Sequence, residues 1–323
     1  MTYSGFFANA KRPQVKKEEK KPLSEDEDGR GHLPSLNQSF PTSEAQRQLW
    51  LLAELDRNAS ASYNVTTSLE LRGSLDVYIL EKTINQVINR HEALRTQIIE
   101  QGELQEVVNQ VKIKLNFIDL KDEDNPEATA LALRSQFSQK PFDLSIAPLF
   151  AVILMRLKPD HYLLSLKTHH IVADGWSLGL ILQEIGQLYS SQNNTTKEVL
   201  TPPMQFRQYL TLRAQETQSP QMLEHRDFWL KTYQEDLPTF ELPTDFPRPA
   251  VKTYTGGQES QVIPSEVGQN LQKVGRKNKA TLFMTMFAAY TAFLRRISGH
   301  KDLVIGIPIS GRQIEGSDNL VGF

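Results

Sequence analysis

The residues best suited to acid–base chemistry lie together in one short stretch, where His169 and His170 are followed by Asp174 and Gly175. Imidazole has an unperturbed pKa of about 6.5, so it can accept or hold a proton near neutral pH. A buried Asp174 would need an arginine partner, or it could cap nearby backbone amides. Gly175 gives the backbone room for an unusual dihedral angle or for a close substrate. The pattern predicts a catalytic site that includes His170, His169, Asp174 and Gly175.

This histidine pair is poorly suited to metal binding. Adjacent residues at a strand end point to opposite faces, so the two rings should diverge. The chain has no cysteine, which removes thiolate ligands, disulfides and a cysteine nucleophile. The segment Arg90–Glu92 begins no zinc helix, because Arg95 stands where a second histidine would be needed. We therefore expect no metal, with one of the two histidines facing a crevice and the other packed inside.

Two strands and a helix are predicted to position the motif. Phe150–Leu157 and Tyr162–Thr168 are rich in β-forming residues and are joined by the turn residues Lys158–Asp160. We expect Ser177 to cap a helix that carries apolar residues at helical spacing. The histidines would then lie between a strand end and a helix, where mixed α/β folds commonly hold reactive groups.

The rest of the chain predicts further elements of both kinds, which indicates the α/β fold class. A capping box at Ser43–Gln46 opens one helix and Asp76 caps another, whose apolar stripe ends at His91. The other expected helices are Pro126–Phe137, Phe206–Arg213, His225–Tyr233, Val267–Lys277 and Leu282–Arg296. The other expected strands are Tyr63–Leu71, Leu94–Ile99, Leu104–Val111 and Leu303–Pro308.

Composition excludes several classes of protein. The 323 residues are 39% hydrophobic and 23% charged, which is typical of a globular protein. A net charge of −2 provides no basic excess for a phosphate backbone, so nucleic acid is not an expected partner. Apolar runs such as Leu149–Met155 are too short to span a bilayer, and the N-terminus lacks a secretion signal. We expect a cytoplasmic protein with no membrane partner.

Changes in composition predict four regions. Residues 1–38 are dense in mixed charge and are expected to form a disordered leader, with a docking segment as the alternative. Residues 39–190 would form a first lobe, residues 191–203 a polar and Pro-rich linker, and residues 204–323 part of a second lobe.

Thr168–Gly179 resembles the core His-His-x-x-x-Asp-Gly motif of the condensation domains of nonribosomal peptide synthetases. Other segments resemble the family's remaining motifs in the family's order: Ser43–Leu51, Arg90–Thr96, Pro141–Leu144, Leu242–Pro249 and Val304–Arg312. Gln205–Tyr209 fits its motif only loosely, and the sequence stops at Gly322-Phe323, inside a motif that continues in the family. We therefore expect the second lobe to be truncated at its C-terminus, either because the chain is a fragment or because the gene is truncated. We expect this chain on its own to aggregate or to expose apolar surface, and to lack condensation activity.

The resemblance implies two chloramphenicol-acetyltransferase-like α/β lobes in a V, with a tunnel between them. It implies an acyltransferase that joins a donor acyl or peptidyl thioester to an acceptor aminoacyl thioester, in nonribosomal peptide or hybrid polyketide biosynthesis. Both substrates would be carried on phosphopantetheine arms of upstream and downstream carrier proteins, with an adenylation domain downstream, and the domain itself would bind no cofactor.

The resemblance also assigns roles to single residues. The second histidine of the motif is the one assigned to the site, so His170 would face the crevice and position or deprotonate the acceptor amine, while His169 would pack toward the interior of the first lobe. Trp176 and Ser177 would line the tunnel. Relatives tie the motif aspartate to an arginine of the second lobe, which implies that Arg312 pairs with Asp174; Arg95 is the other candidate. Arg90 and Arg95 would be structural, against the alternative that at least one is a solvated surface charge.

Two other functions are open. An epimerisation domain shares the core motif, but the continuation Trp176-Ser177 favours condensation because epimerising relatives continue differently. A non-catalytic recruitment or docking domain would use the fold to bind a partner. Such relatives usually lose residues of the motif, and all of them are present here.

Overall fold

A computed structural model describes residues 38–192, 200–235, 240–251, 253–254, 256–257 and 259–323. Of the predicted leader only Gln38 is described, and it begins the strand β1. The rest of the leader and residues 193–199 of the predicted linker lie outside the described residues.

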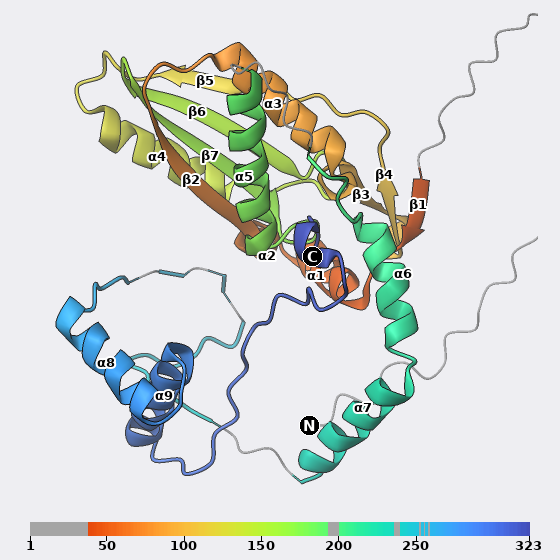
Figure 1. Cartoon of the computed structure of the whole chain (residues 1–323), viewed down its shortest axis with the longest axis vertical. Coiled ribbons are helices and arrows are strands. Elements are labelled where there is room, and N and C mark those ends of the chain that lie inside the picture. Colours follow the sequence, from red (N-terminus) through yellow and green to blue (C-terminus); the bar gives the residue numbers. More distant parts are fainter. Residues whose placement is uncertain (1–37, 193–199, 236–239, 252, 255, 258) are drawn as a thin grey trace, which may run out of the picture. The chain divides into compact units, whose positions relative to one another are not determined.

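Two sheets form the β-structure of the described chain (Figure 1). The larger sheet has the strand order β2-β7-β6-β5, and its strands are β2 (Asn64–Arg72), β5 (Asn116–Asp119), β6 (Phe150–Lys158) and β7 (His161–His169). β7 pairs antiparallel with β2 and β6, whereas β5 runs parallel to β6. The smaller sheet has the order β1-β4-β3, from β1 (Gln38–Pro41), β3 (Thr96–Ile99) and β4 (Leu104–Val107).

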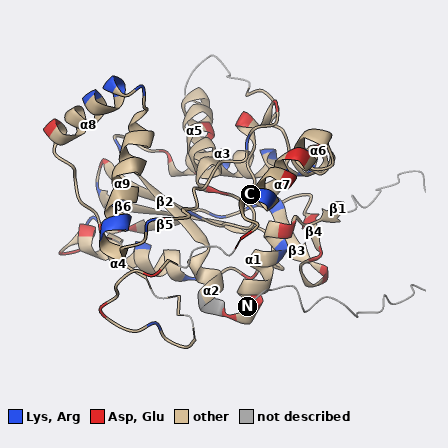
Figure 2. Ribbon diagram, turned by 90° about the horizontal axis from the view of Figure 1, so that it is seen from below, with Lys and Arg blue, Asp and Glu red and all other residues tan. Residues whose placement is uncertain are grey.

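Charged residues are spread over the fold rather than gathered on one element. Figure 2 shows acidic and basic residues interspersed along the ribbon, in keeping with a formal net charge of −2. Within the described residues, no helix has both the length and the apolar character needed to cross a membrane.

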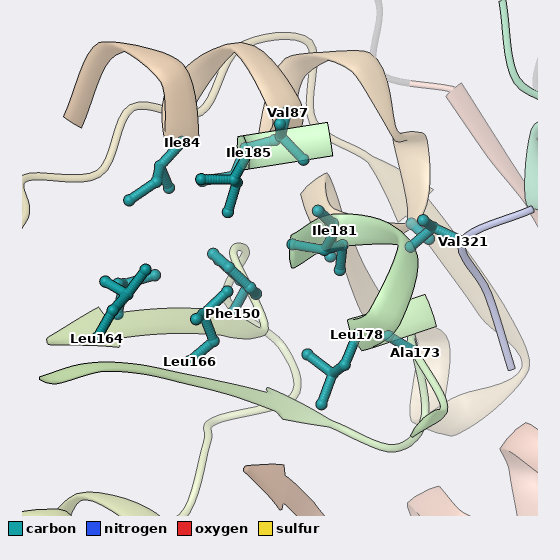
Figure 3. Close-up of a cluster of buried hydrophobic side chains, with 14 of the residues drawn as sticks. Ile84, Val87, Phe150, Leu164, Leu166, Ala173, Leu178, Ile181, Ile185 and Val321 are labelled. Carbon is teal, nitrogen blue, oxygen red and sulfur yellow. The ribbon is translucent and has the colours of Figure 1, made fainter. Parts of the chain in front are cut away.

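Alternation along β6 and β7 divides the core into two faces. The even-numbered side chains of β7, such as Leu164 and Leu166, pack with the helices α3 (Val77–Arg90) and α5 (Gly175–Gln192), as Figure 3 shows. The odd-numbered side chains face the helix α4 (Pro126–Gln139) on the other side of the sheet. This two-residue period is the one that a strand imposes. It also decides on which side of the sheet His169 lies.

The predicted helices are confirmed, most of them with small changes at their ends, but the helix predicted at His225–Tyr233 begins earlier, at Pro220. The helical elements not yet given are α1 (Glu44–Leu55), α2 (Arg57–Ser62), η1 (Glu92–Arg95), η2 (Glu100–Gly102), α6 (Phe206–Glu216), α7 (Pro220–Thr232), α8 (Ser265–Lys277), α9 (Leu282–Ser298) and η3 (Ser317–Asn319). Both caps are as predicted, since Ser43 and Gln46 form a complete capping box and Asp76 accepts a hydrogen bond from the amide of Ile79.

Three of the predicted strands differ from the structure, and one of them, Leu104–Val111, is shorter and ends at Val107. Leu303–Pro308 is not a strand: every strand in the described chain lies between Gln38 and His169, so this segment has no neighbour to complete a ladder. The β-forming residues are there, but a strand needs a partner. The predicted strand at Leu94–Ile99 begins only at Thr96, because its first residues form the 3-10 turn η1.

Candidate active site

His169 is the last residue of β7 and its side chain is fully buried. Its Nδ1 accepts a hydrogen bond from the backbone amide of Ile171 at 3.2 Å. Burial and, to a smaller extent, the nearby His170 lower the pKa of His169 to about 4, against a backbone hydrogen bond with Ser60 that raises it. His169 is therefore neutral at physiological pH, which keeps Nδ1 available as an acceptor.

His170 is only partly buried, so the two histidines differ in exposure as the strand pattern predicts. Its backbone amide donates to the carbonyl oxygen of Tyr63 at 2.8 Å. Its ring meets the ring of Phe323 edge to face, with centroids 5.0 Å apart. In the described part of the chain, no hydrogen-bond partner reaches Nδ1 of His170. The ring is thus held by its backbone and by an aromatic neighbour.

Asp174 caps the helix that follows the histidines. Its Oδ1 accepts from the backbone amide of Ser177 at 2.8 Å and from the hydroxyl of Ser177 at 2.7 Å. The prediction that Ser177 is the cap is therefore wrong: α5 begins two residues earlier, at Gly175. A carboxylate is favoured at this position because it also faces the positive end of the helix dipole.

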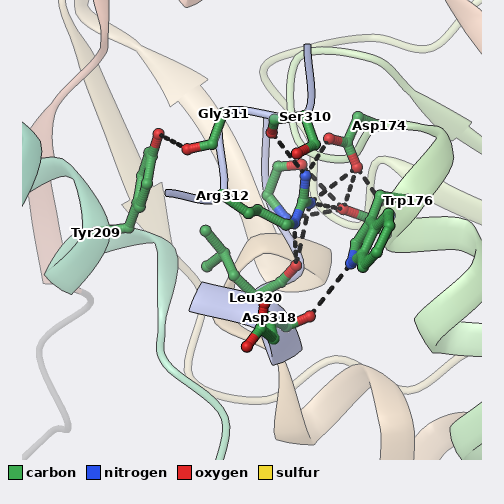
Figure 4. A network of polar contacts seen from close by, with 10 residues as sticks. Asp174, Trp176, Tyr209, Ser310, Gly311, Arg312, Asp318 and Leu320 are labelled. Atoms are coloured by element: carbon green, nitrogen blue, oxygen red, sulfur yellow. Dashed lines mark hydrogen bonds and ion pairs between the residues drawn. The ribbon is translucent and has the colours of Figure 1, made fainter. Parts of the chain in front are cut away.

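The same carboxylate forms a bidentate ion pair with Arg312 (Figure 4). Nη1 of Arg312 lies 2.6 Å from Oδ2 of Asp174, and Nη2 lies 2.9 Å from Oδ1. Only 5% of the Arg312 side chain and 19% of the Asp174 side chain are exposed. Burial would raise the pKa of Asp174, but hydrogen bonds from Arg312 and Ser177 outweigh it and the pKa is lowered. The implied pairing is confirmed, and the local cap considered as its alternative is present as well.

The Asp174–Arg312 pair is the centre of a larger network that docks the end of the chain on α5. Arg312 also donates to the carbonyl oxygen of Leu320 at 3.1 Å, and the indole of Trp176 donates to the carbonyl of Asp318 at 3.2 Å. The Arg312 guanidinium lies 5.9 Å from the centre of the Trp176 ring, a cation–π contact. Figure 4 shows Arg312 between the Asp174 carboxylate and the Leu320 carbonyl, with Trp176 beside them and bonded to Asp318.

Ser177 belongs to this network and not to a substrate surface. Its side chain is fully buried, and its hydroxyl accepts from the backbone amide of Gly322 at 3.1 Å. Gly322 must be glycine here, because a Cβ would collide with the ring of Phe206. The implied tunnel position of Ser177 is therefore wrong. Trp176, by contrast, is 53% exposed.

Arg90 and Arg95 both have specific partners, so neither is a freely solvated charge. Nε of Arg90 lies 3.1 Å from both carboxylate oxygens of Glu184, and Nη2 reaches the carbonyl of Thr201. Burial would raise the pKa of Glu184, but His91 and Arg90 outweigh it and the pKa is lowered. The ion pair ties α3 to α5.

Arg95 binds the backbone just after β4, and its contacts do not include Asp174. Its Nη1 donates to the carbonyl oxygens of Val108 at 2.5 Å and Asn109 at 3.2 Å, just after β4. Burial lowers the pKa of Arg95, partly offset by the nearby Glu92. This contact explains why the predicted strand to Val111 stops at Val107, since the next carbonyls are turned toward Arg95.

Sequence reasoning missed three residues of the site. Glu184 binds the side chains of Arg90 and His91. The feature of the sequence that could have indicated it is its position, an acidic residue three positions after Ile181 in the apolar stripe of a helix. Gln205 bridges the Arg90 carbonyl and the Glu92 amide at 3.0 and 2.9 Å, and its only signal in the sequence is its place in the loosely fitting motif Gln205–Tyr209. Gln46 was noticed only as a helix cap. Among the described side chains, no group of three or more His, Asp or Glu residues could hold a metal ion.

Residues 37–323 match the family model of the condensation domain. The chain belongs to the condensation-domain family. It is 36% identical over 291 residues to a linear gramicidin synthase protein of Brevibacillus parabrevis, covering 88% of this chain and 6% of that protein. It is 33% identical over 285 residues to gramicidin S synthase 2 of Aneurinibacillus migulanus, covering 88% of this chain and 6% of that protein. The chain thus spans a small part of the length of these relatives.

Solved structures agree with this placement. The SgcC5 protein of Streptomyces globisporus superimposes with a TM-score of 0.73 and 25% identity, over 87% of this chain and 66% of that one. The first condensation domain of the CDA synthetase gives a TM-score of 0.73 and 21% identity, over 89% of this chain and 68% of that one. The resemblance drawn from the sequence and the α/β fold class are confirmed.

Proposed function

We propose that this domain joins a donor acyl or peptidyl thioester to the amine of an acceptor aminoacyl thioester. The observation that carries the proposal is the loop after His170, fixed by the Asp174–Arg312 pair in a member of the condensation-domain family. All residues of the core motif are present, and His170 is partly exposed whereas His169 is fully buried. The named relatives are peptide synthases, which supports substrates of this class.

In the proposed reaction, the acceptor nitrogen attacks the donor carbonyl carbon. A C–N bond forms, the C–S bond breaks, and the thiol of the donor arm leaves with the proton that the nitrogen loses. His170 positions the amine or carries this proton. A thioester is already activated, so much of the acceleration comes from holding the two substrates together. General-base help adds about 10²–10⁴-fold.

The other residues keep His170 in place. His169 is neutral and buried, and its Nδ1 holds the backbone of Ile171. Asp174 is engaged by Arg312 and Ser177 and has no role in proton transfer in this proposal. Trp176 is the motif residue that we place at the substrate surface, because it is exposed beside this network.

The proposed partners are carrier proteins upstream and downstream, whose phosphopantetheine arms deliver the two thioesters, and an adenylation domain downstream. The arms are substrates of the domain rather than its own cofactor. We also propose the division into a first lobe at 39–190, a linker at 191–203 and part of a second lobe at 204–323.

The test uses the full-length protein with donor and acceptor carriers loaded with their thioesters. We expect amide product, and a loss of about 10²–10⁴-fold in its rate in His170→Ala. His225→Ala, on the exposed surface of α7, is the matched control and should keep the wild-type rate. Inversion of the donor without amide would identify an epimerisation domain instead. Carrier binding without turnover would identify a recruitment domain.

A further inference from the structure

The side-chain amide of Gln46 is fully buried and uses all of its hydrogen-bonding capacity. Its Oε1 accepts from the backbone amide of Ser43 at 3.0 Å and from Nε2 of Gln105 at 2.9 Å. Its Nε2 donates to Oε1 of Gln105 at 3.1 Å and to the carbonyl oxygen of Ile171 at 2.9 Å. A primary amide offers two donors and two acceptor sites, so none remains.

A helix cap alone does not explain this arrangement. The capping box uses only Oε1 of Gln46, whereas Nε2 reaches Ile171, 125 residues away in the sequence. Gln105 on β4 is itself 1% exposed, and its Nε2 also donates to the carbonyl of Pro41 at 3.1 Å. The reciprocal amide pair therefore anchors Gln46 to the smaller sheet, so that its remaining N–H has a fixed direction.

That remaining N–H fixes the residue that follows His170. Ile171 is held by its carbonyl through Gln46, by its amide through Nδ1 of His169, and by a fully buried side chain. On the other side, the amide of His170 donates to Tyr63. The backbone is thus held on both sides of the His170 side chain, whereas no described residue gives a hydrogen bond to Nδ1 of the ring, which contacts Phe323 edge to face.

We propose that Gln46 is a positioning residue for His170. Its amide holds the Ile171 carbonyl, and this sets the direction in which the His170 ring leaves the backbone. The inference rests on the proposed role of His170 in amide formation. A displacement of about 1 Å at a reacting group can cost about 100-fold in rate, so the effect of losing Gln46 falls on kcat.

The decisive variant is Gln46→Glu, which keeps the size and one oxygen of the side chain but removes both Nε2 protons. We expect kcat for amide formation to fall about 10- to 100-fold, with KM for the carriers unchanged. Gln48→Glu makes the same change on the exposed side of the same helix and should behave as wild type. Gln46→Met, which adds no charge, should lower kcat in the same way.

A second readout separates positioning from stability. Leu157→Ala opens a cavity in the separate core cluster under α4, and should lower the melting temperature while the folded protein keeps its kcat. The chain has seven histidines, so after isotope labelling of histidine the carbon–proton signals of the imidazole rings can be resolved by NMR. The signal of His170 is the one that disappears in His170→Ala.

We expect Gln46→Glu to displace the His170 signal and leave that of His225 in place, and Gln48→Glu to displace neither. An unmoved His170 signal in Gln46→Glu would overturn the inference, as would an equal loss of kcat in Leu157→Ala. If the wild-type protein forms no amide, the proposed function fails, while the His170 signal still decides whether Gln46 positions that ring.

Discussion

Arg312 places two guanidinium nitrogens on the two carboxylate oxygens of Asp174, 138 residues away in the sequence. The pair joins the segment before η3 to the loop that carries His170 into α5. Parallel N–H···O bonds of this kind fix orientation as well as distance, which lysine could not do. Because Asp174 also caps α5, one carboxylate determines both the start of the helix and the place of the loop.

Breaking this pair should destabilise the protein strongly. Loss of one partner of a buried ion pair costs about 3–5 kcal/mol, whereas loss of a helix cap costs about 1 kcal/mol. Asp174→Asn keeps an oxygen for the cap but removes the charge, so it reports mainly on the pair. We expect Asp174→Asn and Arg312→Gln each to lower the free energy of unfolding in urea by the larger amount.

A double-mutant cycle measures the coupling. The double variant should cost much less than the sum of the two single variants, because the second change removes a charge that is already unpaired. Strictly additive costs would show that the contact contributes nothing to stability.

His169 should make the protein sensitive to mild acid. Its pKa is about 4 in the folded state and about 6.5 in the unfolded state, so the unfolded state binds the proton more tightly. This contribution to stability is present above pH 6.5 and is lost as the pH falls toward 4. Between pH 7 and pH 5 the loss is about 2 kcal/mol.

The test compares the free energy of unfolding in urea at pH 7 and at pH 5. His169→Asn keeps an acceptor for the Ile171 amide but cannot be protonated, so the difference between the two pH values should shrink. His225→Asn, on an exposed helix, should leave the wild-type difference unchanged. An equal loss in wild type and His169→Asn would contradict the assignment.

Local signals were sufficient to predict most elements, since caps, turns and apolar spacing act over a few residues. Contacts between segments that are distant in the sequence could not be predicted from such local signals. The partner of Asp174 came from family resemblance, and the bond from Gln46 to Ile171 left no local trace. The strand predicted at Leu303–Pro308 was wrong for the related reason that strand formation depends on a neighbour, which the pattern of one segment cannot reveal.

Lys167 should produce a pH dependence of the same sign as that of His169, but at alkaline pH. It lies two residues before His169 on the α4 side of β7, with Nζ 2.6 Å from the carbonyl of Lys140 and 4.6 Å from the ring centre of Phe142. Burial lowers its pKa to about 8, with Lys140 contributing. The unfolded state therefore holds the proton more tightly, and stability should increase from pH 8 to pH 10.

The comparison is with Lys167→Met, which keeps the apolar stem and removes the titrating group. The increase in the free energy of unfolding between pH 8 and pH 10 should be smaller in the variant. Lys158→Met, at the more exposed end of β6, serves as the control and should retain the wild-type increase. If the free energy of unfolding rises between pH 8 and pH 10 as much in Lys167→Met as in the wild type, the buried ammonium of Lys167 is not the source of the increase.

Arg90 should contribute more to stability than Arg95, although both belong to one motif. Arg90→Ala leaves the Glu184 carboxylate, whose side chain is only 12% exposed, with His91 as a remaining hydrogen-bond partner but without the guanidinium. Arg95→Ala leaves backbone carbonyls, one of them at a part-exposed position, that water can satisfy. Arg72→Ala removes an ion pair with Glu70 that is largely exposed, and such pairs contribute about 0–1 kcal/mol. Melting temperatures should therefore fall most in Arg90→Ala, less in Arg95→Ala and least in Arg72→Ala. If Arg90→Ala and Arg95→Ala both melt at the wild-type temperature, as Arg72→Ala is expected to do, the proposed structural role of the two motif arginines is wrong.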